Sequence, residues 1–138
     1  MNDHIILRTV IRVLVPFIFM YGLYVQFHGD YSPGGGFQAG VICAAAFIFY
    51  GLVYGLPETM RVIPVMFVRL TASLGVLIYI SVGVITMVMG ENFLNYSVLS
   101  EDPVRGQHLG ILIIELSVGI TVFSVMMLIF YMFADRSR

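Results

Sequence analysis

One carboxylate lies inside the most apolar stretch of this sequence, and its residue type points to ion or proton chemistry. Glu115 is the single charged residue between Leu109 and Phe133. It follows Leu109 by six residues, about 9 Å along a helix. Ionisable residues inside a membrane mark ion paths, proton relays or buried contacts. Glu115 and His108, two turns earlier on the same face, are therefore the candidate cation-ligand or proton-exchanging site. A protonated carboxyl that bonds a neighbouring subunit is the equally weighted alternative.

The remaining side chains offer no conventional enzymatic site. None of the three histidines has metal-ligand spacing to another histidine or to a carboxylate, and the single cysteine, Cys43, excludes an internal disulfide and a Cys-based cluster. Gly34 to Gly36 with Ala39 formally satisfies the dinucleotide pattern G-x-G-x-x-A, but that pattern acts only between a strand and a helix. We therefore expect no cofactor, no resident metal and no enzyme.

The glycine run has a structural interpretation as the entry to a helix. Ser32 can cap that helix and Pro33 suits its first turn, while the glycines allow a positive φ or a close backbone approach. The functional alternative is an anion site or an aqueous entrance formed by the exposed amides.

Composition makes the bilayer the solvent of the elements that carry these residues. Hydrophobic residues make up 59% of the chain and charged residues 11%, against about 25% charged in soluble domains. Crossing a hydrocarbon core of about 30 Å takes about 20 apolar residues. The sequence therefore predicts an all-α integral membrane protein, one membrane domain over 1–138, with four transmembrane helices at about 5–27, 37–56, 70–89 and 109–133.

The positions of the arginines predict that both termini are cytoplasmic, because short loops rich in basic residues stay inside. Arg105 alone falls on the outer side, and the other six arginines fall at the termini or between the second and third helices: Arg8, Arg12, Arg61, Arg69, Arg136 and Arg138. Arg8 and Arg12, four residues apart, share one helix face near the cytoplasmic end, where their side chains reach the headgroups.

Small residues recur at helix-packing spacing in the second and third predicted helices. Gly36, Gly40 and Ala44 are four residues apart, and Thr71 and Gly75 begin a similar stripe. Such stripes let membrane helices approach closely. Partner subunits are one explanation of so many close-contact faces, and packing within the chain is the equally weighted alternative.

The stretch His28 to Gly40, H-G-D-Y-S-P-G-G-G-F-Q-A-G, resembles the signature H-x-x-x-(S/A)-P-G-G-G-F-x-x-G of the MnhB/MrpB family of Mrp-type multisubunit sodium/proton antiporters. The motif residues are His28, Asp30, Ser32, Pro33, Gly34, Gly35, Gly36, Phe37 and Gly40. Three further segments resemble the outer-loop and last-helix motifs of that family: Gly90 to Leu94, Gln107 to Ile111 and Ile114 to Gly119. Ser117 stands where that pattern has Gly. The resemblance covers nearly the whole chain.

This resemblance implies a small accessory subunit of a hetero-oligomeric antiporter in a bacterial or archaeal plasma membrane. The complex exchanges Na+ for H+, and members of this family contribute to its assembly. A share in the sodium path, with transient Na+ at Glu115, is the candidate ion role. A chain with no Lys and one carboxylate deep in a helix is poorly equipped to run two ion paths alone.

Two rival interpretations remain. A four-helix drug/proton exporter acting as a homodimer also has one membrane glutamate, but in that class it lies in the first helix, whereas here it lies in the fourth. The other rival is a purely structural assembly subunit. Several distinct membrane partners that co-purify in mild detergent indicate the antiporter complex, and a lone homodimer indicates the exporter.

Overall fold

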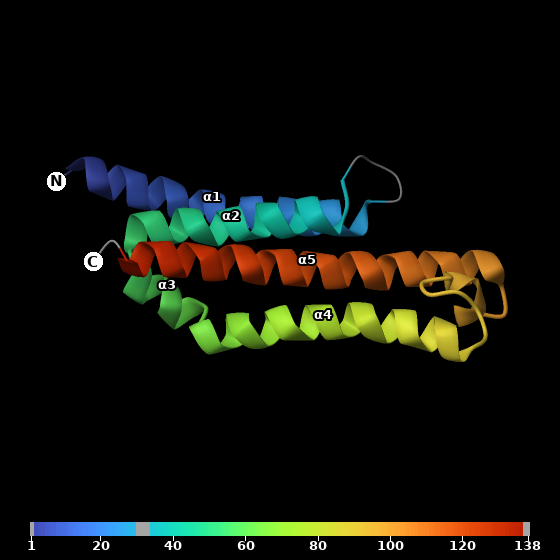
Figure 1. Ribbon diagram of the computed structural model, residues 1–138. Coiled ribbons are helices and arrows are strands. Elements are labelled where there is room, and N and C mark those ends of the chain that lie inside the picture. Colours follow the sequence, from blue (N-terminus) through green and yellow to red (C-terminus); the bar gives the residue numbers. More distant parts are fainter. Residues whose placement is uncertain (1, 30–33, 137–138) are drawn as a thin grey trace.

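The computed structural model describes residues 2–29 and 34–136, and helices account for most of this part of the chain (Figure 1). Its long helices are α1 (Asn2–Phe27), α2 (Gly36–Tyr54), α4 (Val65–Val88) and α5 (Pro103–Arg136). A short helix, α3 (Leu56–Val62), joins α2 to α4, and a 3-10 helix, η1 (Tyr96–Leu99), lies between α4 and α5. The described residues contain no strand. The all-α prediction is confirmed.

Each long helix contains a segment apolar and long enough to cross a membrane: His4–Phe27, Gly36–Tyr54, Val65–Val88 and Pro103–Arg136. The prediction of a multi-pass protein with four transmembrane helices is therefore confirmed. The start of α1 and the end of α5 lie at the same end of the bundle (Figure 1), as an even number of crossings requires. We call this the terminal end, and the opposite end, where α1 ends, α2 begins and residues 89–102 lie, the loop end.

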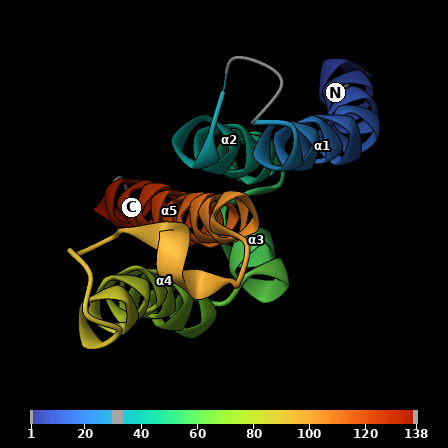
Figure 2. The same ribbon diagram turned by 90° about the vertical axis from the view of Figure 1, so that its right-hand side faces the viewer.

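The long helices stand in the order α1, α2, α5, α4, which differs from their order in the sequence. α1 packs on α2, α2 on α5, and α4 on α5. Viewed along the bundle, α5 lies between α2 and α4 (Figure 2). The last helix of the chain therefore joins the α1–α2 hairpin to α4.

Small residues allow these close contacts. A Cβ added at Gly40 would lie 2.7 Å from the carbonyl oxygen of Gly119, and one added at Gly75 would lie 2.9 Å from that of Ser117. Between α4 and α5, the hydroxyl oxygens of Thr71 and Ser124 are 2.7 Å apart and hydrogen-bonded. The small residues pack against neighbours of the same chain, which favours internal packing over partner contacts as the role of these stripes.

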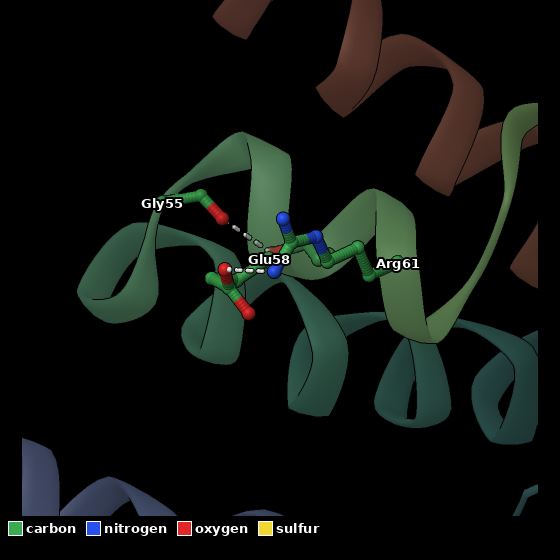
Figure 3. A network of polar contacts seen from close by, with 4 residues as sticks. Gly55, Glu58 and Arg61 are labelled. Carbon is green, nitrogen blue, oxygen red and sulfur yellow. Dashed lines mark hydrogen bonds and ion pairs between the residues drawn. The ribbon is translucent and has the colours of Figure 1, made fainter.

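A helix takes the place of much of the loop expected after residue 56. Gly55 has a φ of 93°, in the left-handed region that glycine tolerates, and it separates α2 from α3. In α3, Arg61 Nη1 lies 3.1 Å from Glu58 Oε1 and the Thr59 hydroxyl donates to the Gly55 carbonyl at 2.9 Å (Figure 3). The Arg61–Glu58 pair is exposed and contributes little stability.

The main hydrophobic cluster of buried residues lies at the terminal end, where α3 and the start of α4 meet α5. It consists of Leu56, Ile63, Val68, Met127 and Tyr131. The Tyr131 hydroxyl donates to the Ile63 carbonyl at 2.8 Å. This bond ties the turn after α3 to α5.

At the loop end α5 extends beyond the α1–α2 hairpin. It begins at Pro103, six residues before the expected Leu109. Asp102 Oδ1 accepts a hydrogen bond from the Val104 amide at 3.0 Å, and Pro103 occupies the first turn, a combination that favours a helix start. Glu115 therefore lies about 18 Å along α5, at 1.5 Å per residue, rather than about 9 Å. The α1–α2 hairpin ends well short of the loop end of α5 (Figure 1).

Candidate functional site

The carboxylate of Glu115 lies where the end of α1, the α1–α2 connection and α5 meet. A Cβ added at Gly29 would lie 3.1 Å from Glu115 Oε2, and one added at Gly35 would lie 3.3 Å from Glu115 Oε1. The side chain is half-buried. Glu115 and the glycine run, which the sequence singled out separately, therefore lie in one place.

The glycine run brings the backbone to this carboxylate in two ways. Gly34 has a φ of 131°, which L-residues with side chains rarely adopt. Gly36, the first residue of α2, packs so closely that an added Cβ would overlap the carbonyl oxygen of Glu115. The N-terminus of α2, the positive end of its helix dipole, consequently lies beside Glu115.

Gly35 is the N-cap of α2, and its amide donates to Gln38 Oε1 at 3.0 Å. Three motif residues fall outside the described part of the chain: Asp30, Ser32 and Pro33. The predicted roles of Ser32 as helix cap and of Pro33 in the first turn therefore concern residues that the structure does not describe. The local hydrogen bond that the structure describes at this helix start comes from Gln38 instead.

Gln26 is a polar residue whose importance the sequence did not reveal. Its Oε1 would lie 2.6 Å from a Cβ added at Gly119, one turn after Glu115 on α5. The residue is only 4% exposed, and its Nε2 is buried without a hydrogen-bond partner in the described structure. The only sequence signal for Gln26 was a carboxamide near the end of an apolar span. In the structure it belongs, with Gly29, Gly35, Gly36 and Glu115, to one contact region that we call the Glu115 junction.

The other candidate residues differ in their surroundings: one packs against α5, and the others are exposed. Gly40 packs against Gly119 and Val122 of α5. His28 is exposed and stacks on Tyr24, with ring centroids 4.7 Å apart, and Phe37 is 60% exposed. His108 is exposed as well and lies two turns before Glu115. Within residues 2–29 and 34–136, no three His, Cys, Asp or Glu side chains are grouped to hold a metal ion.

Comparison with known sequences identifies a family for the chain. Residues 6–128 match the family described as a domain related to the MnhB subunit of Na+/H+ antiporter. The chain belongs to the MnhB family. The match includes Gln26, the glycine run and Glu115, so the whole junction lies within the MnhB domain. The family suggested by the glycine motif is confirmed.

Individual MnhB relatives cover most of the chain. Proteins named antiporter subunit mnhB2 from Staphylococcus aureus strains Newman, JH1 and USA300 are each 36% identical over 107 residues. Each alignment covers 77% of this chain and 74% of the relative.

Proposed function

We propose that this MnhB-family chain is an accessory subunit of a multisubunit Na+/H+ antiporter, a transporter component rather than an enzyme. Its family and its four membrane-spanning helices support this role. The other membrane subunits of the complex are its partners, and the bacterial plasma membrane is its location. The terminal end, where α1 begins, α3 lies and α5 ends, faces the cytoplasm, because five arginines belong to the first half of α1, to α3, to the start of α4 and to the end of α5: Arg8, Arg12, Arg61, Arg69 and Arg136.

Glu115 is the residue through which this subunit exchanges a proton or binds Na+ transiently. The observation that carries this proposal is the placement of its carboxylate beside Gly29, Gly35 and the N-terminus of α2, whose helix dipole attracts negative charge. The site lies at the loop end of the α1–α2 hairpin, about a third of the way along α5 from Pro103. His108, two turns further out on α5, is the candidate for the step between Glu115 and the outer solution.

Replacing Glu115 with Gln tests this role, because Gln keeps the size and hydrogen bonding but removes the charge. We expect the complex to assemble and its Na+/H+ exchange to fall about tenfold at neutral pH, the scale of losing one hydrogen bond to a charged group. The measurement is fluorescence-detected proton movement in everted membrane vesicles on addition of Na+, over a range of pH. His108→Gln is expected to give a smaller fall.

Glu101→Gln is the matched control, since Glu101 is an exposed glutamate of the α4–α5 connection. It removes a carboxylate of the same type outside the Glu115 site and should leave exchange unchanged. Normal exchange by an assembled Glu115→Gln complex would reduce Glu115 to a structural contact. In that case the subunit serves assembly alone.

Purification of the tagged chain in mild detergent tests the subunit assignment itself. Several different hydrophobic proteins should co-migrate with it on a native gel. A homodimer without other proteins would contradict the subunit assignment, independently of what Glu115 does.

A further inference from the structure

Two arginines of α1 converge on one tyrosine of α2 at the terminal end. The guanidinium carbons of Arg8 and Arg12 lie 5.8 and 5.9 Å from the centroid of the Tyr54 ring. The Tyr54 hydroxyl donates to the Arg8 carbonyl at 3.0 Å, and the rings of Tyr50 and Tyr54 stack with their centroids 4.6 Å apart. Two positive charges are thus gathered around one aromatic side chain. We call Arg8, Arg12 and Tyr54 the arginine–tyrosine site.

The length of α2 places this site at the boundary of the hydrocarbon core. α2 has 19 residues and ends at Tyr54, and at 1.5 Å per residue it is about 28 Å long. This length is close to the thickness of the hydrocarbon core, about 30 Å. Tyrosine rings favour the boundary between the hydrocarbon and the headgroups. The ring of Tyr54 therefore lies at the level where the headgroups of one leaflet begin.

The side chain of Arg12 extends toward the same boundary. Its backbone lies four residues further along α1 than that of Arg8, about 6 Å deeper at 1.5 Å per residue. Its guanidinium group nevertheless lies at the same ring as that of Arg8. Long basic side chains near helix ends reach out of the hydrocarbon in this way.

The described side chains do not neutralise these two charges. The ion pair found among them joins Arg61 to Glu58 in α3, and no described carboxylate pairs with Arg8 or Arg12. Both arginines are exposed. A guanidinium group next to hydrocarbon is costly without an anionic partner. One that stacks on a ring keeps the N–H groups in its own plane available for such a partner.

The level and the charge of the site indicate which anion it takes. Arginine binds phosphate through paired N–H···O bonds, and lipid phosphates lie just outside the hydrocarbon core, beside Tyr54. Basic sites at the ends of membrane helices attract anionic headgroups. A phosphocholine headgroup would bring its own cation close to the two arginines, whereas a phosphatidylglycerol headgroup would not. The site therefore favours a lipid with a net negative charge.

We propose that Arg8, Arg12 and Tyr54 bind the phosphate of an anionic phospholipid in the leaflet at the terminal end. The N–H groups of both arginines donate to the phosphate oxygens, and the Tyr54 ring holds the two side chains together. This inference depends neither on the transport role of Glu115 nor on which side of the membrane the terminal end faces.

The test compares two phospholipids that have the same acyl chains and differ in headgroup charge. The full chain in mild detergent is titrated with phosphatidylglycerol or phosphatidylcholine, and bound lipid is measured by native mass spectrometry. Wild type should bind phosphatidylglycerol about tenfold more tightly, since each arginine near anionic lipid contributes about fivefold. Arg8→Gln/Arg12→Gln should abolish this preference. Equal binding of both lipids by wild type would overturn the proposal.

A second pair of arginines supplies the matched control. Arg61→Gln/Arg69→Gln removes two charges from α3 and the start of α4, outside the arginine–tyrosine site, and should keep the preference. Its loss there as well would contradict a defined site. Arg8→Lys/Arg12→Lys keeps both charges but loses the paired N–H bonds, so it should bind phosphatidylglycerol more weakly than wild type. Circular dichroism in the same detergent checks that each variant is folded, and unchanged binding by the folded Lys variant would contradict the proposal.

Competition distinguishes a lipid headgroup from a soluble phosphate. Inorganic phosphate shares the chemistry of the headgroup but has no acyl chains, so it should displace no more phosphatidylglycerol than chloride does at equal ionic strength. Greater displacement would assign the site to a soluble anion. Release of a protein subunit from the complex by Arg8→Gln/Arg12→Gln, with the lipid preference unchanged, would assign the arginines to a partner. Either result would overturn the proposal.

Discussion

Gly36 determines how closely α2 approaches the residue that carries the proposed function. At this position the backbone of α2 meets the backbone of Glu115, whereas at Gly35 it meets only the end of the Glu115 side chain. A flexible carboxylate can move by a few tenths of an ångström, but a helix backbone cannot do so alone. A side chain at position 36 is therefore excluded by the backbone of α5, whereas a small side chain at position 35 can be accommodated.

Gly36→Ala should destabilise the α2–α5 contact by about 1–3 kcal/mol, the usual cost of overpacking. Ala is a better helix former than Gly by about 1 kcal/mol, so a net loss of stability reports the collision with Glu115. Gly35→Ala is the control, because Gly35 has an extended backbone with a φ of −140°. Thermal unfolding of the full chain in detergent, followed by circular dichroism, measures both. Equal stability of the two variants would show that the glycines are only a permissive loop.

The residues of this junction were predictable to different degrees. Glu115 could be found because a lone charge in an apolar run has few uses, and the glycines because they form a motif. Their meeting could not be predicted, because nothing in a helical repeat says which neighbour a given face will contact. Gln26 was missed because an uncharged carboxamide in an apolar run resembles ordinary variation.

Two tyrosine hydroxyls form hydrogen bonds between helical elements at the terminal end, one in a buried position and one in an exposed position. Tyr131 of α5 donates to the Ile63 carbonyl in the buried cluster at 2.8 Å. Tyr54 at the end of α2 donates to the Arg8 carbonyl at 3.0 Å on the exposed surface. Its ring also lies under the guanidinium groups of Arg8 and Arg12, at 5.8 and 5.9 Å.

Tyr131→Phe should destabilise the protein by about 1–2 kcal/mol, because it leaves the Ile63 carbonyl buried without its donor. Tyr54→Phe keeps the ring over the arginines and loses only an exposed hydrogen bond, so it should cost about 0.5 kcal/mol or less. Unfolding of the two variants in the same detergent gives the comparison. A larger effect at Tyr54 than at Tyr131 would contradict the ranking of the buried bond above the exposed one.

Element boundaries were predicted best where apolar runs end in glycine or proline. The sequence contained a signal for the early start of α5, namely Asp102 before Pro103. The prediction began the helix at Leu109 instead, because residues 103–108 are mostly polar and lower the hydropathy of this segment. α3 was missed because seven residues are too few for a reliable apolar period. The extension of α5 beyond the α1–α2 hairpin at the loop end includes the residues of that early start.

The orientation of the molecule in the membrane can be tested with single cysteines in a Cys43→Ala background. Arg61→Cys, at an exposed position of α3, should resist an impermeant thiol reagent added outside intact cells. Glu101→Cys, in the α4–α5 connection, should react unless a partner subunit covers it. Both should react after the membrane is permeabilised. Labelling of residue 61 but not residue 101 from outside would reverse the orientation.

For the molecule as a whole, the membrane class followed from composition, since a chain with 59% hydrophobic residues has few alternatives to membrane helices. The number of crossings followed from four apolar runs of spanning length. The neighbour order α1, α2, α5, α4 did not. Small residues lie on several faces, and each is compatible with contact inside the chain or with a partner. Only the packed structure shows that Gly40 and Gly75 face opposite sides of the same helix, α5.

The position of α5 between the hairpin and α4 also sets the order of events during synthesis. Among the described helices α5 is made last, yet it provides the main contacts of α4 and the main contacts of α2 outside the α1–α2 hairpin. Until it enters the bilayer, Gly36 and Gly40 have no α5 to pack against. A nascent chain stalled before residue 103 would therefore present two separate pieces to lipid and to quality-control proteases, and the contact of Glu115 with Gly29, Gly35 and Gly36 would form only after α5 has been made.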